Sequence, residues 1–437
     1  MGCGFNPLNP LDPTGLINDT AKDLNPFGMG DPFVMMTSLD FNQNLKIMGE
    51  SWTKIKHWLV PDMRRDREAM TNSALTNRRW VYGTCRVSGQ LAYAESSGSK
   101  NEFLHLIVIL ASHPVASFQK VYLDDKPIED YGTNASYKLF NGTQTTACAE
   151  MIAASAGKWT ANHILKGCAY IYLQLTYDET LYVSGLPTVK VVLNGKPLYD
   201  PRTGLTTGIS DPNVKVDVKP VDDQSGGYTG WNDNPALCAR DYMLIPEELG
   251  GMGCTLDEID DASIIAAADI CDQWVYKTTD GSQQEKRFTC SGTFEINSTP
   301  KKILDALLQS MAGTPLFIQG KWRIFAGACG STSGLVTLDE SWLNGGISFK
   351  LGSNKSEKIN TIKGTFVDPD DHWASKGFPP VTSAAYIAED GGEELSEDIT
   401  LNFTISPSMA QRLARSSWSR AAGICRLITR ATLRLSR

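Results

Sequence analysis

Five β-favouring runs, separated by turn-rich segments between about residues 77 and 200, are the feature that most limits how this chain can fold. The runs either alternate apolar and polar residues or are apolar throughout, which is typical of strands rather than helices. The longest apolar run, FLHLIVILA at 103–111, suits a buried strand and is too short to span a bilayer as a helix. The sequence therefore predicts a mainly antiparallel β domain.

Two segments of this region match position by position, KVYLDDKPI at 120–128 and KVVLNGKPL at 190–198. Asp124-Asp125 in the first and Asn194-Gly195 in the second are pairs that favour two-residue hairpin turns. We therefore expect a hairpin at each place. The two hairpins are either equivalent elements of a repeat or similar by chance.

The segment 299–327 predicts a helix followed by a hairpin. A threonine and a proline at 299–300 are typical of a helix start, apolar residues then recur at helical spacing, and Gly313 can end the helix. Gln319-Gly320 separates two β-favouring runs. The spacing of a phosphate-binding loop is missing around GKW at 320–322. Four residues of this segment are expected to be largely buried: Leu307, Leu308, Trp322 and Phe325.

Changes of period and composition predict a multidomain, β-rich α+β protein. We expect four parts: an N-terminal extended arm with helices at 1–76, a β-rich domain at 77–230, an α+β domain at 231–333, and a further β-rich segment at 334–437 that ends in a helix and is incomplete. The last part contains the acidic stretch AEDGGEELSED.

Charge and cysteine usage exclude some classes of protein. The net charge of −8 argues against nucleic-acid binding, because affinity for phosphate comes mainly from Lys and Arg. The ten cysteines never form a Cys-x-x-Cys pair, and several lie in apolar runs, which favours buried reduced thiols over disulfides. The N-terminus has neither the basic nor the apolar region of a signal peptide, so it is not expected to be one.

No set of catalytic residues can be assembled from the motifs. The five histidines lack His-Glu-x-x-His spacing, and neither a Gly-x-Ser-x-Gly elbow nor a recognisable carboxylate pair is present. The most metal-like group is Asp368, Asp370, Asp371 and His372, but its spacing favours an acidic turn around Pro369. We therefore predict no catalytic, cofactor-binding or metal-binding residues. Five tryptophans could stack on sugars or fill cores and interfaces: Trp231, Trp274, Trp322, Trp342 and Trp373.

Five segments in order resemble one family. They are GLPTVKVVLNGKPLYDPRTG (185–204), WNDNPALCARDYML (231–244), IDDASIIAAADICDQWV (259–275), KRFTCSGTF (286–294) and ILDALLQSMAGTPLFIQGKWRIFAGA (303–328). They are similar to the hub portion of tail tip proteins of tailed bacteriophages, the host specificity protein J family. The segment ISPSMAQRLAR (405–415) resembles the next helix of that family.

The resemblance implies a non-enzymatic structural protein of the virion, a homotrimer of β-rich hub domains at the tail tip or baseplate. Such a hub closes the distal end of the tail tube and supports the central fibre for host attachment and DNA delivery. Its implied partners are other tail proteins, namely the tail tube or distal tail protein and the tape measure protein. The host receptor would be met indirectly, without sequence-specific nucleic-acid binding. Synthesis would take place in the cytoplasm of the bacterial host.

The end of the chain departs from the family, whose members continue into further hub and fibre domains. Residues 415–437 contain six arginines and no acid in an otherwise acidic protein. This change favours an out-of-frame or remnant sequence, and a basic helix that binds a partner is the alternative. Family resemblance predicts a helix from about Ser406, with Met409 and Leu413 facing the hub, and composition predicts poor packing beyond about residue 418.

Two other functions remain open on sequence grounds. A tail-associated glycan or peptidoglycan hydrolase would need two converging carboxylates or a Cys-His pair in a cleft. A carbohydrate-binding β module would need exposed, coplanar tryptophans.

Overall fold

The structure is a computed structural model that describes residues 77–178, 181–182, 186–202, 231–277, 281–327, 348–349, 359–422 and 427–428. The described chain forms two compact units. Unit 1 contains Val87–Val192, and unit 2 contains Arg78–Arg86 together with the residues from Leu193 onward. The predicted N-terminal arm with helices at 1–76 lies outside the described residues.

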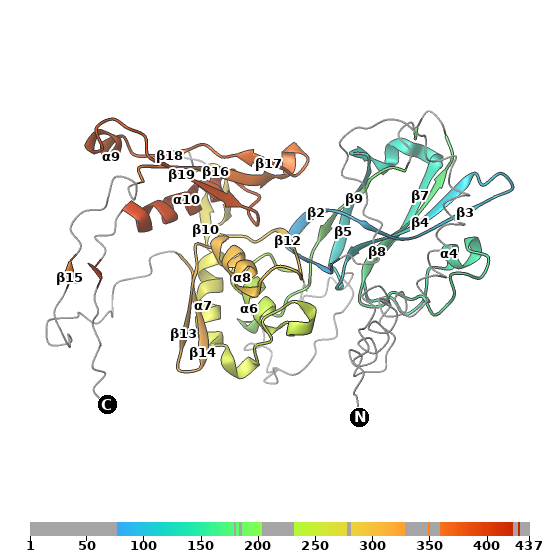
Figure 1. Ribbon diagram of the computed structural model, residues 1–437, viewed down its shortest axis with the longest axis horizontal. Coiled ribbons are helices and arrows are strands. Elements are labelled where there is room, and N and C mark those ends of the chain that lie inside the picture. The colour runs from blue at the N-terminus through green and yellow to red at the C-terminus, as the bar shows by residue number, and fades with distance from the viewer. Residues whose placement is uncertain are drawn as a thin grey trace, which may run out of the picture. The chain divides into compact units, whose positions relative to one another are not determined.

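An antiparallel four-stranded sheet is the larger sheet of unit 1 (Figure 1). Its strands, in spatial order, are β3 (Gln90–Ser97), β4 (Phe103–Ala111), β8 (Ala169–Thr176) and β7 (Ala135–Phe140). β4 is the FLHLIVILA run, and every residue after Phe103 is buried. Burial on both faces explains why this strand is apolar without alternation.

A small core lies around helix α4 (Ala149–Ala154) in unit 1. Its buried members come from β4, β8, α4 and the loop that follows: Ile107, Ile109, Cys148, Met151, Trp159, Leu165, Tyr170 and Tyr172. Phe140 stacks on Tyr170 with ring centroids 4.3 Å apart. These contacts attach the helical segment to the sheet.

The second sheet of this region has the spatial order β2 (Thr84–Ser88), β9 (Val189–Asn194), β5 (Ser117–Leu123) and β6 (Lys126–Pro127). The chain passes from unit 2 to unit 1 within β2 and returns within β9. The predicted hairpin at Asp124-Asp125 is confirmed, with φ values of 47° and 66° that suit a two-residue turn. The 3₁₀ segment η1 (Ile128–Asn134) follows β6.

The predicted hairpin at Asn194-Gly195 is wrong. The chain continues alongside Val81–Gly83, with the Gly195 amide donating to the Gly83 carbonyl at 2.7 Å and the Lys196 amide donating to the Val81 carbonyl at 2.8 Å. A Cβ at residue 195 would lie 2.3 Å from the Val81 oxygen. Glycine is therefore suited to this position by close backbone approach rather than by a turn.

Unit 2 is built around three helices: α6 (Pro235–Leu244), α7 (Asp261–Cys271) and α8 (Pro300–Gln309). Asn234 caps α6 by accepting from the Ala236 amide at 3.1 Å, and its side-chain amide donates to the Ala268 carbonyl at 2.9 Å. Two short 3₁₀ segments, η2 (Glu247–Leu249) and η3 (Leu256–Glu258), connect α6 with α7.

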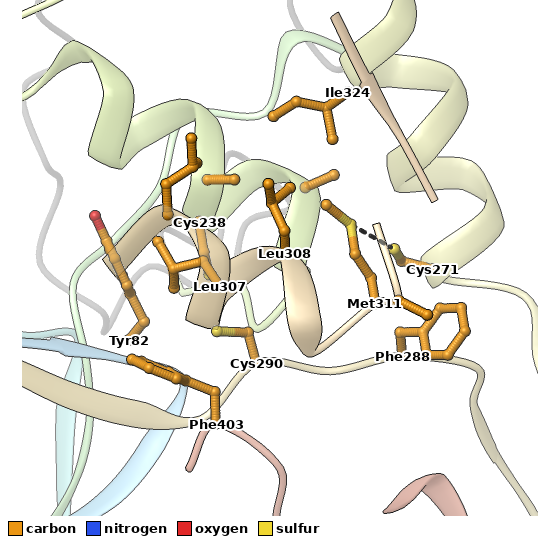
Figure 2. Close-up of a cluster of buried hydrophobic side chains, with 14 of the residues drawn as sticks. Tyr82, Cys238, Cys271, Phe288, Cys290, Leu307, Leu308, Met311, Ile324 and Phe403 are labelled. Atoms are coloured by element: carbon orange, nitrogen blue, oxygen red, sulfur yellow. Dashed lines mark hydrogen bonds between the residues drawn. The ribbon is translucent and has the colours of Figure 1, made fainter. Parts of the chain in front are cut away.

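The helices share one core with strand β1 (Arg79–Tyr82), which pairs with β12 (Gly292–Glu295). Figure 2 shows part of this core. Tyr82 is fully buried, and its hydroxyl donates to Asp241 Oδ2 at 2.6 Å. Phe294 lies edge-on to Tyr242, with centroids 5.3 Å apart. These contacts hold β1 and β12 against α6, although β1 is far from α6 in the sequence.

Two hairpins belong to unit 2. The first consists of β10 (Trp274–Tyr276) and β11 (Gln284–Lys286), and the second of β13 (Thr314–Ile318) and β14 (Lys321–Phe325). The predicted helix and hairpin of 299–327 are confirmed, with Gln319 and Gly320 at φ 54° and 77° in the turn. Leu307 and Leu308 are buried, as expected.

The C-terminal part of unit 2 is a mixed sheet with two helices. Its elements are β16 (Thr361–Asp368), η6 (Pro369–Asp371), β17 (Ala374–Gly377), β18 (Val381–Thr382), α9 (Ala384–Glu389), β19 (Ser396–Leu401) and α10 (Pro407–Ala422). β16 is central, with β19 parallel on one side and β17 and β18 antiparallel to it. The sequence predicted strands here but not α9.

Helix α10 begins where the sequence predicts and packs on β16 and β18. Met409 and Leu413 are buried, at 1% and 2% exposure, as expected. Beyond α10 the structure describes β20 (Leu427–Ile428), which pairs with β15 (Ser348–Phe349). The side chains beyond Ser417 lie outside the described residues, so poor packing there stays a prediction. The α+β, β-rich, multidomain fold class is confirmed.

Candidate assembly interface

Within the described residues, no three His, Cys, Asp or Glu side chains are grouped so that they could hold a metal ion. The metal-like cluster is an acidic turn. Asp368 caps it by accepting from the Asp370 amide at 3.0 Å, and its other oxygen pairs with Lys376 Nζ at 2.6 Å. His372 follows with a left-handed φ of 51°. The Asp368 carboxylate therefore holds the turn and β17 in place.

One serine and one histidine that the sequence did not connect lie together in unit 1. Ser97 Oγ is 2.7 Å from His105 Nε2, and His105 Nδ1 is 2.8 Å from the Tyr172 hydroxyl. The side chains come from β3, β4 and β8, and burial lowers the pKa of His105, although Glu95 opposes that shift. His105 Nδ1, the ring nitrogen that does not face Ser97, contacts the Tyr172 hydroxyl. In a hydrolytic triad the corresponding nitrogen contacts a carboxylate. The arrangement joins three strands.

The nearby carboxylate is engaged elsewhere. Glu95 Oε2 accepts from Lys158 Nζ at 2.9 Å and from the Tyr93 hydroxyl at 3.0 Å. Glu95 is 3% exposed, and its buried charge is compensated by Lys158, whose side chain is 32% exposed. Among the remaining described histidines, His113 contacts the Pro114 carbonyl and His163 stacks on Trp159. These contacts hold local structure.

The candidate sugar-stacking tryptophans do not form one platform in the described residues. Trp274 is 68% exposed, whereas Trp231, Trp322 and Trp373 are half-buried. Trp342 lies outside the described residues. Tyr276, which is two residues from Trp274 on β10, is 64% exposed, so the two rings are on the same face of that strand.

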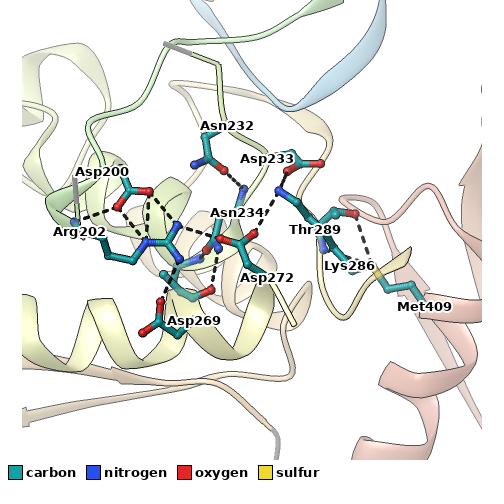
Figure 3. A network of polar contacts seen from close by, with 12 residues as sticks. Asp200, Arg202, Asn232, Asp233, Asn234, Asp269, Asp272, Lys286, Thr289 and Met409 are labelled. Carbon is teal, nitrogen blue, oxygen red and sulfur yellow. Dashed lines mark hydrogen bonds and ion pairs between the residues drawn. The ribbon is translucent and has the colours of Figure 1, made fainter. Parts of the chain in front are cut away.

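A network of ion pairs and hydrogen bonds connects residues that precede 203 with residues that follow 230 (Figure 3). Arg202 contacts Asp200 at 2.7 Å, Asp272 at 2.8 Å and Asp269 at 3.1 Å. Hydrogen bonding to Asp200 is the main cause of a raised Arg202 pKa. Lys286 bridges Asp233 at 3.0 Å and Asp272 at 3.1 Å. Burial alone would raise the Asp272 pKa, but Arg202 and Lys286 lower it. The network is structural, because each charge has an opposite partner.

The seven cysteines of the described residues lie outside any disulfide. They are Cys85, Cys148, Cys168, Cys238, Cys254, Cys271 and Cys290. Burial raises the pKa of Cys238 and of Cys271, so both side chains are held as neutral thiols rather than reactive thiolates. Cys168 and Cys254 are half-buried and the other five are buried, so the expected burial holds for five of the seven, and their reduced state stays a prediction.

The β13–β14 hairpin exposes apolar side chains on both faces, and Phe317, on the same face as Trp322 and Ile324, is 57% exposed. Leu316 and Ile318 alternate with Phe317 along β13, and Phe325 lies across from Thr314 on β14. Leu316, Ile318 and Phe325 are 42%, 42% and 48% exposed, and we call these three side chains the hairpin face. The opposite side of β14 carries Ile324, which is 1% exposed and contributes to the core.

The expectation that Phe325 is buried is therefore wrong. Successive strand residues point to opposite faces, so residues 322 and 325 cannot both point at the helices. Trp322 is half-buried, packs against the core and contacts Phe317, with ring centroids 5.1 Å apart. On the edge of β14 that does not pair with β13, the Asp260 amide donates to the Trp322 carbonyl at 2.9 Å. This hydrogen bond helps to hold β14 in place.

Helix α9 is also uncovered. None of its residues is buried, although five of the six are Ala, Tyr or Ile. Tyr386 is 40% exposed, and Ala384, Ala385 and Ala388 are exposed. We call these four side chains the α9 surface. Two uncovered apolar surfaces on one unit are typical of a subunit that assembles with other chains.

None of the helices in the described ranges is both long and apolar enough to cross a bilayer.

Comparison with solved structures finds the same fold in a virus-like particle. A chain of a structure described as the virion of a native gene transfer agent (GTA) particle aligns with a TM-score of 0.52 and 15% sequence identity. The alignment covers 86% of this chain and 82% of that chain. No protein-family model matches the sequence, and a comparison with curated proteins finds no match. The likeness therefore establishes a shared fold over most of both chains.

Proposed function

We propose that this chain is a structural subunit of a virion or virus-like particle. The observation that carries the proposal is the fold shared with a chain of the GTA virion, because the alignment extends over 86% of this chain rather than over one module. The two uncovered apolar surfaces of unit 2 support the same function, since assembly subunits bury such surfaces against their neighbours.

Within the particle, we propose a place in the hub at the distal tip of the tail. This finer assignment rests on the five ordered segments, between residues 185 and 328, that resemble the host specificity protein J family. The subunit would then be one of three copies that close the tail tube and support a central fibre. Its partners would be the tail tube or distal tail protein and the tape measure protein, and it would act without catalysis.

The mass of the purified assembly tests the hub proposal. Sedimentation equilibrium or mass photometry should give three times the 47.8 kDa of one chain. A second measurement is the position of the protein in purified particles, where antibody-gold labelling should lie at the distal end of the tail. A monomer of the purified chain, together with labelling along the tail or on the capsid, would contradict a trimeric hub.

A carbohydrate-binding module is the second candidate, and the observation that favours it is the exposed pair Trp274 and Tyr276 on one face of β10. Stacking on a sugar ring would quench the fluorescence of Trp274. A panel of bacterial surface glycans should be titrated with the wild-type chain and with Trp274→Ala. Saturable quenching that the substitution abolishes would favour the module, and no change with any glycan would leave the structural role as the better account.

A further inference from the structure

The hairpin face and the α9 surface carry opposite charge at their edges. Residues 313–327, which contain the hairpin, have two basic residues, Lys321 and Arg323, and no acid. Residues 384–398, which contain α9, have six acids and no basic residue. Lys321 is exposed and lies directly across from Ile318, so its charge borders the apolar side chains. Glu389, Glu393 and Glu394 are exposed beside or just after α9.

The two surfaces lie in different parts of unit 2. The hairpin runs beside α7, whereas α9 follows β18 in the C-terminal sheet, and Figure 1 draws them at opposite ends of the unit. Within one chain they therefore do not cover each other. Arg323, across from Leu316, is paired with Asp260, and Glu394 is paired with Lys363, so the charges that remain to meet a second copy are those of Lys321 beside the hairpin face and Glu389 beside α9. Exposed apolar side chains flanked by opposite charges make two unlike surfaces complementary.

We infer that the hairpin face of one copy of this chain packs against the α9 surface of a second copy. The inference rests on the proposed role as an assembly subunit and adds the surfaces through which copies meet. Because unlike surfaces meet, the contact is heterologous, and each copy can use its hairpin toward one neighbour and α9 toward the other. Such a contact closes into a ring when the rotation between copies divides a full turn.

Three variants separate this contact from other modes of assembly. The hairpin variant, Leu316→Glu with Phe325→Glu, places acids opposite the acidic rim of α9. The α9 variant, Ala385→Arg with Ala388→Arg, adds bulk to exposed helix positions and keeps good helix formers. The control, Tyr137→Glu, changes an aromatic residue that is 44% exposed on β7 in unit 1.

Sedimentation of the full-length chain should give the wild-type oligomer for the control and a weakening of association by about 100-fold or more for the other two variants, as expected when the centre of an interface is lost. Each variant keeps one intact surface. An equimolar mixture of the hairpin variant and the α9 variant at high concentration should therefore form 1:1 dimers and nothing larger, because one complementary pair remains and a ring cannot close.

A milder charge exchange guards against variants that fail to fold. Lys321→Glu and Glu389→Lys leave every apolar side chain in place, and each should weaken association by a few-fold, roughly the effect of a charge at the rim. The chain that carries both substitutions should recover the wild-type association. Circular dichroism identifies any variant that has lost its fold.

Two results would overturn the inference while the hub proposal stands. The first is a wild-type oligomer that survives in both double variants, and the second is a mixture of the two variants that stays monomeric although each is folded. A wild-type chain that is monomeric at all concentrations would overturn both the inference and the trimeric hub.

Discussion

Replacing Ile324 by alanine should destabilise unit 2, whereas the same replacement at Phe325, the next residue of β14, should have little effect on the isolated chain. The two side chains differ in burial because neighbours on a strand point to opposite faces. Ile324 is 1% exposed and belongs to the core of the three helices, and Phe325 is 48% exposed on the hairpin face.

The magnitudes follow from burial. Ile324→Ala removes three carbons from a fully buried side chain, about 2 to 3 kcal/mol of transfer free energy at about 0.8 kcal/mol per carbon. The remaining cavity adds to this, and the total falls within about 2 to 5 kcal/mol. A loss of about 3 kcal/mol lowers the melting temperature of a domain of this size by about 6 to 12 °C. Phe325→Ala should cost less than about 1 kcal/mol, as at other exposed sites.

Thermal denaturation followed by circular dichroism at two protein concentrations checks both values. The loss at Ile324 should be independent of concentration, because it arises inside one chain. Any loss at Phe325 should appear only at the higher concentration, because it reflects association. Equal, concentration-independent losses at the two positions would refute the assignment of faces in β14, and with it the hairpin face.

Three further outcomes are expected. Burial alone would raise the Glu285 pKa, but hydrogen bonds from Ser408 and Ser406 and the ion pair with Arg412 lower it. A carboxyl group whose pKa is lowered by folding stabilises the folded state at pH values above its unfolded-state pKa, which is about 4.3 for Glu. The free energy of unfolding, measured by urea denaturation, should therefore be higher for wild type than for Glu285→Gln at pH 7, and this difference should fade as the pH falls below about 4. Gly195→Ala should cost about 2 kcal/mol or more in the same assay, because its Cβ would meet the Val81 carbonyl. The thiol of Cys238 should resist alkylation until guanidinium unfolds the chain, as mass spectrometry of the labelled peptides can determine.

Local signals predicted the helix and hairpin of residues 299–327 because each signal had a conformational cause close to it in sequence. Proline at 300 fixes a helical φ at the first turn of α8, and Gly320 accepts the left-handed φ of 77° that the hairpin turn requires. These preferences do not depend on distant residues. Burial of Leu307 and Leu308 followed from the helical period alone.

Two errors had different origins. Phe325 is three residues from Trp322, and residues an odd number apart on a strand point to opposite faces. The two side chains could therefore not both be buried on one face, and the sequence already contained this information. The hairpin expected at Asn194-Gly195 used a genuine turn preference that long-range pairing overrides, since the backbone there bonds to Val81 and Gly83 more than a hundred residues earlier. The Ser97–His105–Tyr172 contact was missed for the same reason, because three strands must pair before those side chains meet.

Assembly surfaces are the hardest feature to predict, because they use the residue types of a core. The period of β13 and β14 assigns Leu316 and Ile318 to one face and Ile324 to the other, but it does not say which face the same chain covers. That choice depends on where α7 packs, and α7 packs on the side of Ile324. The uncovered face then needs a partner from outside the chain, and the opposite charge beside α9 makes a second copy the partner that this chain itself supplies.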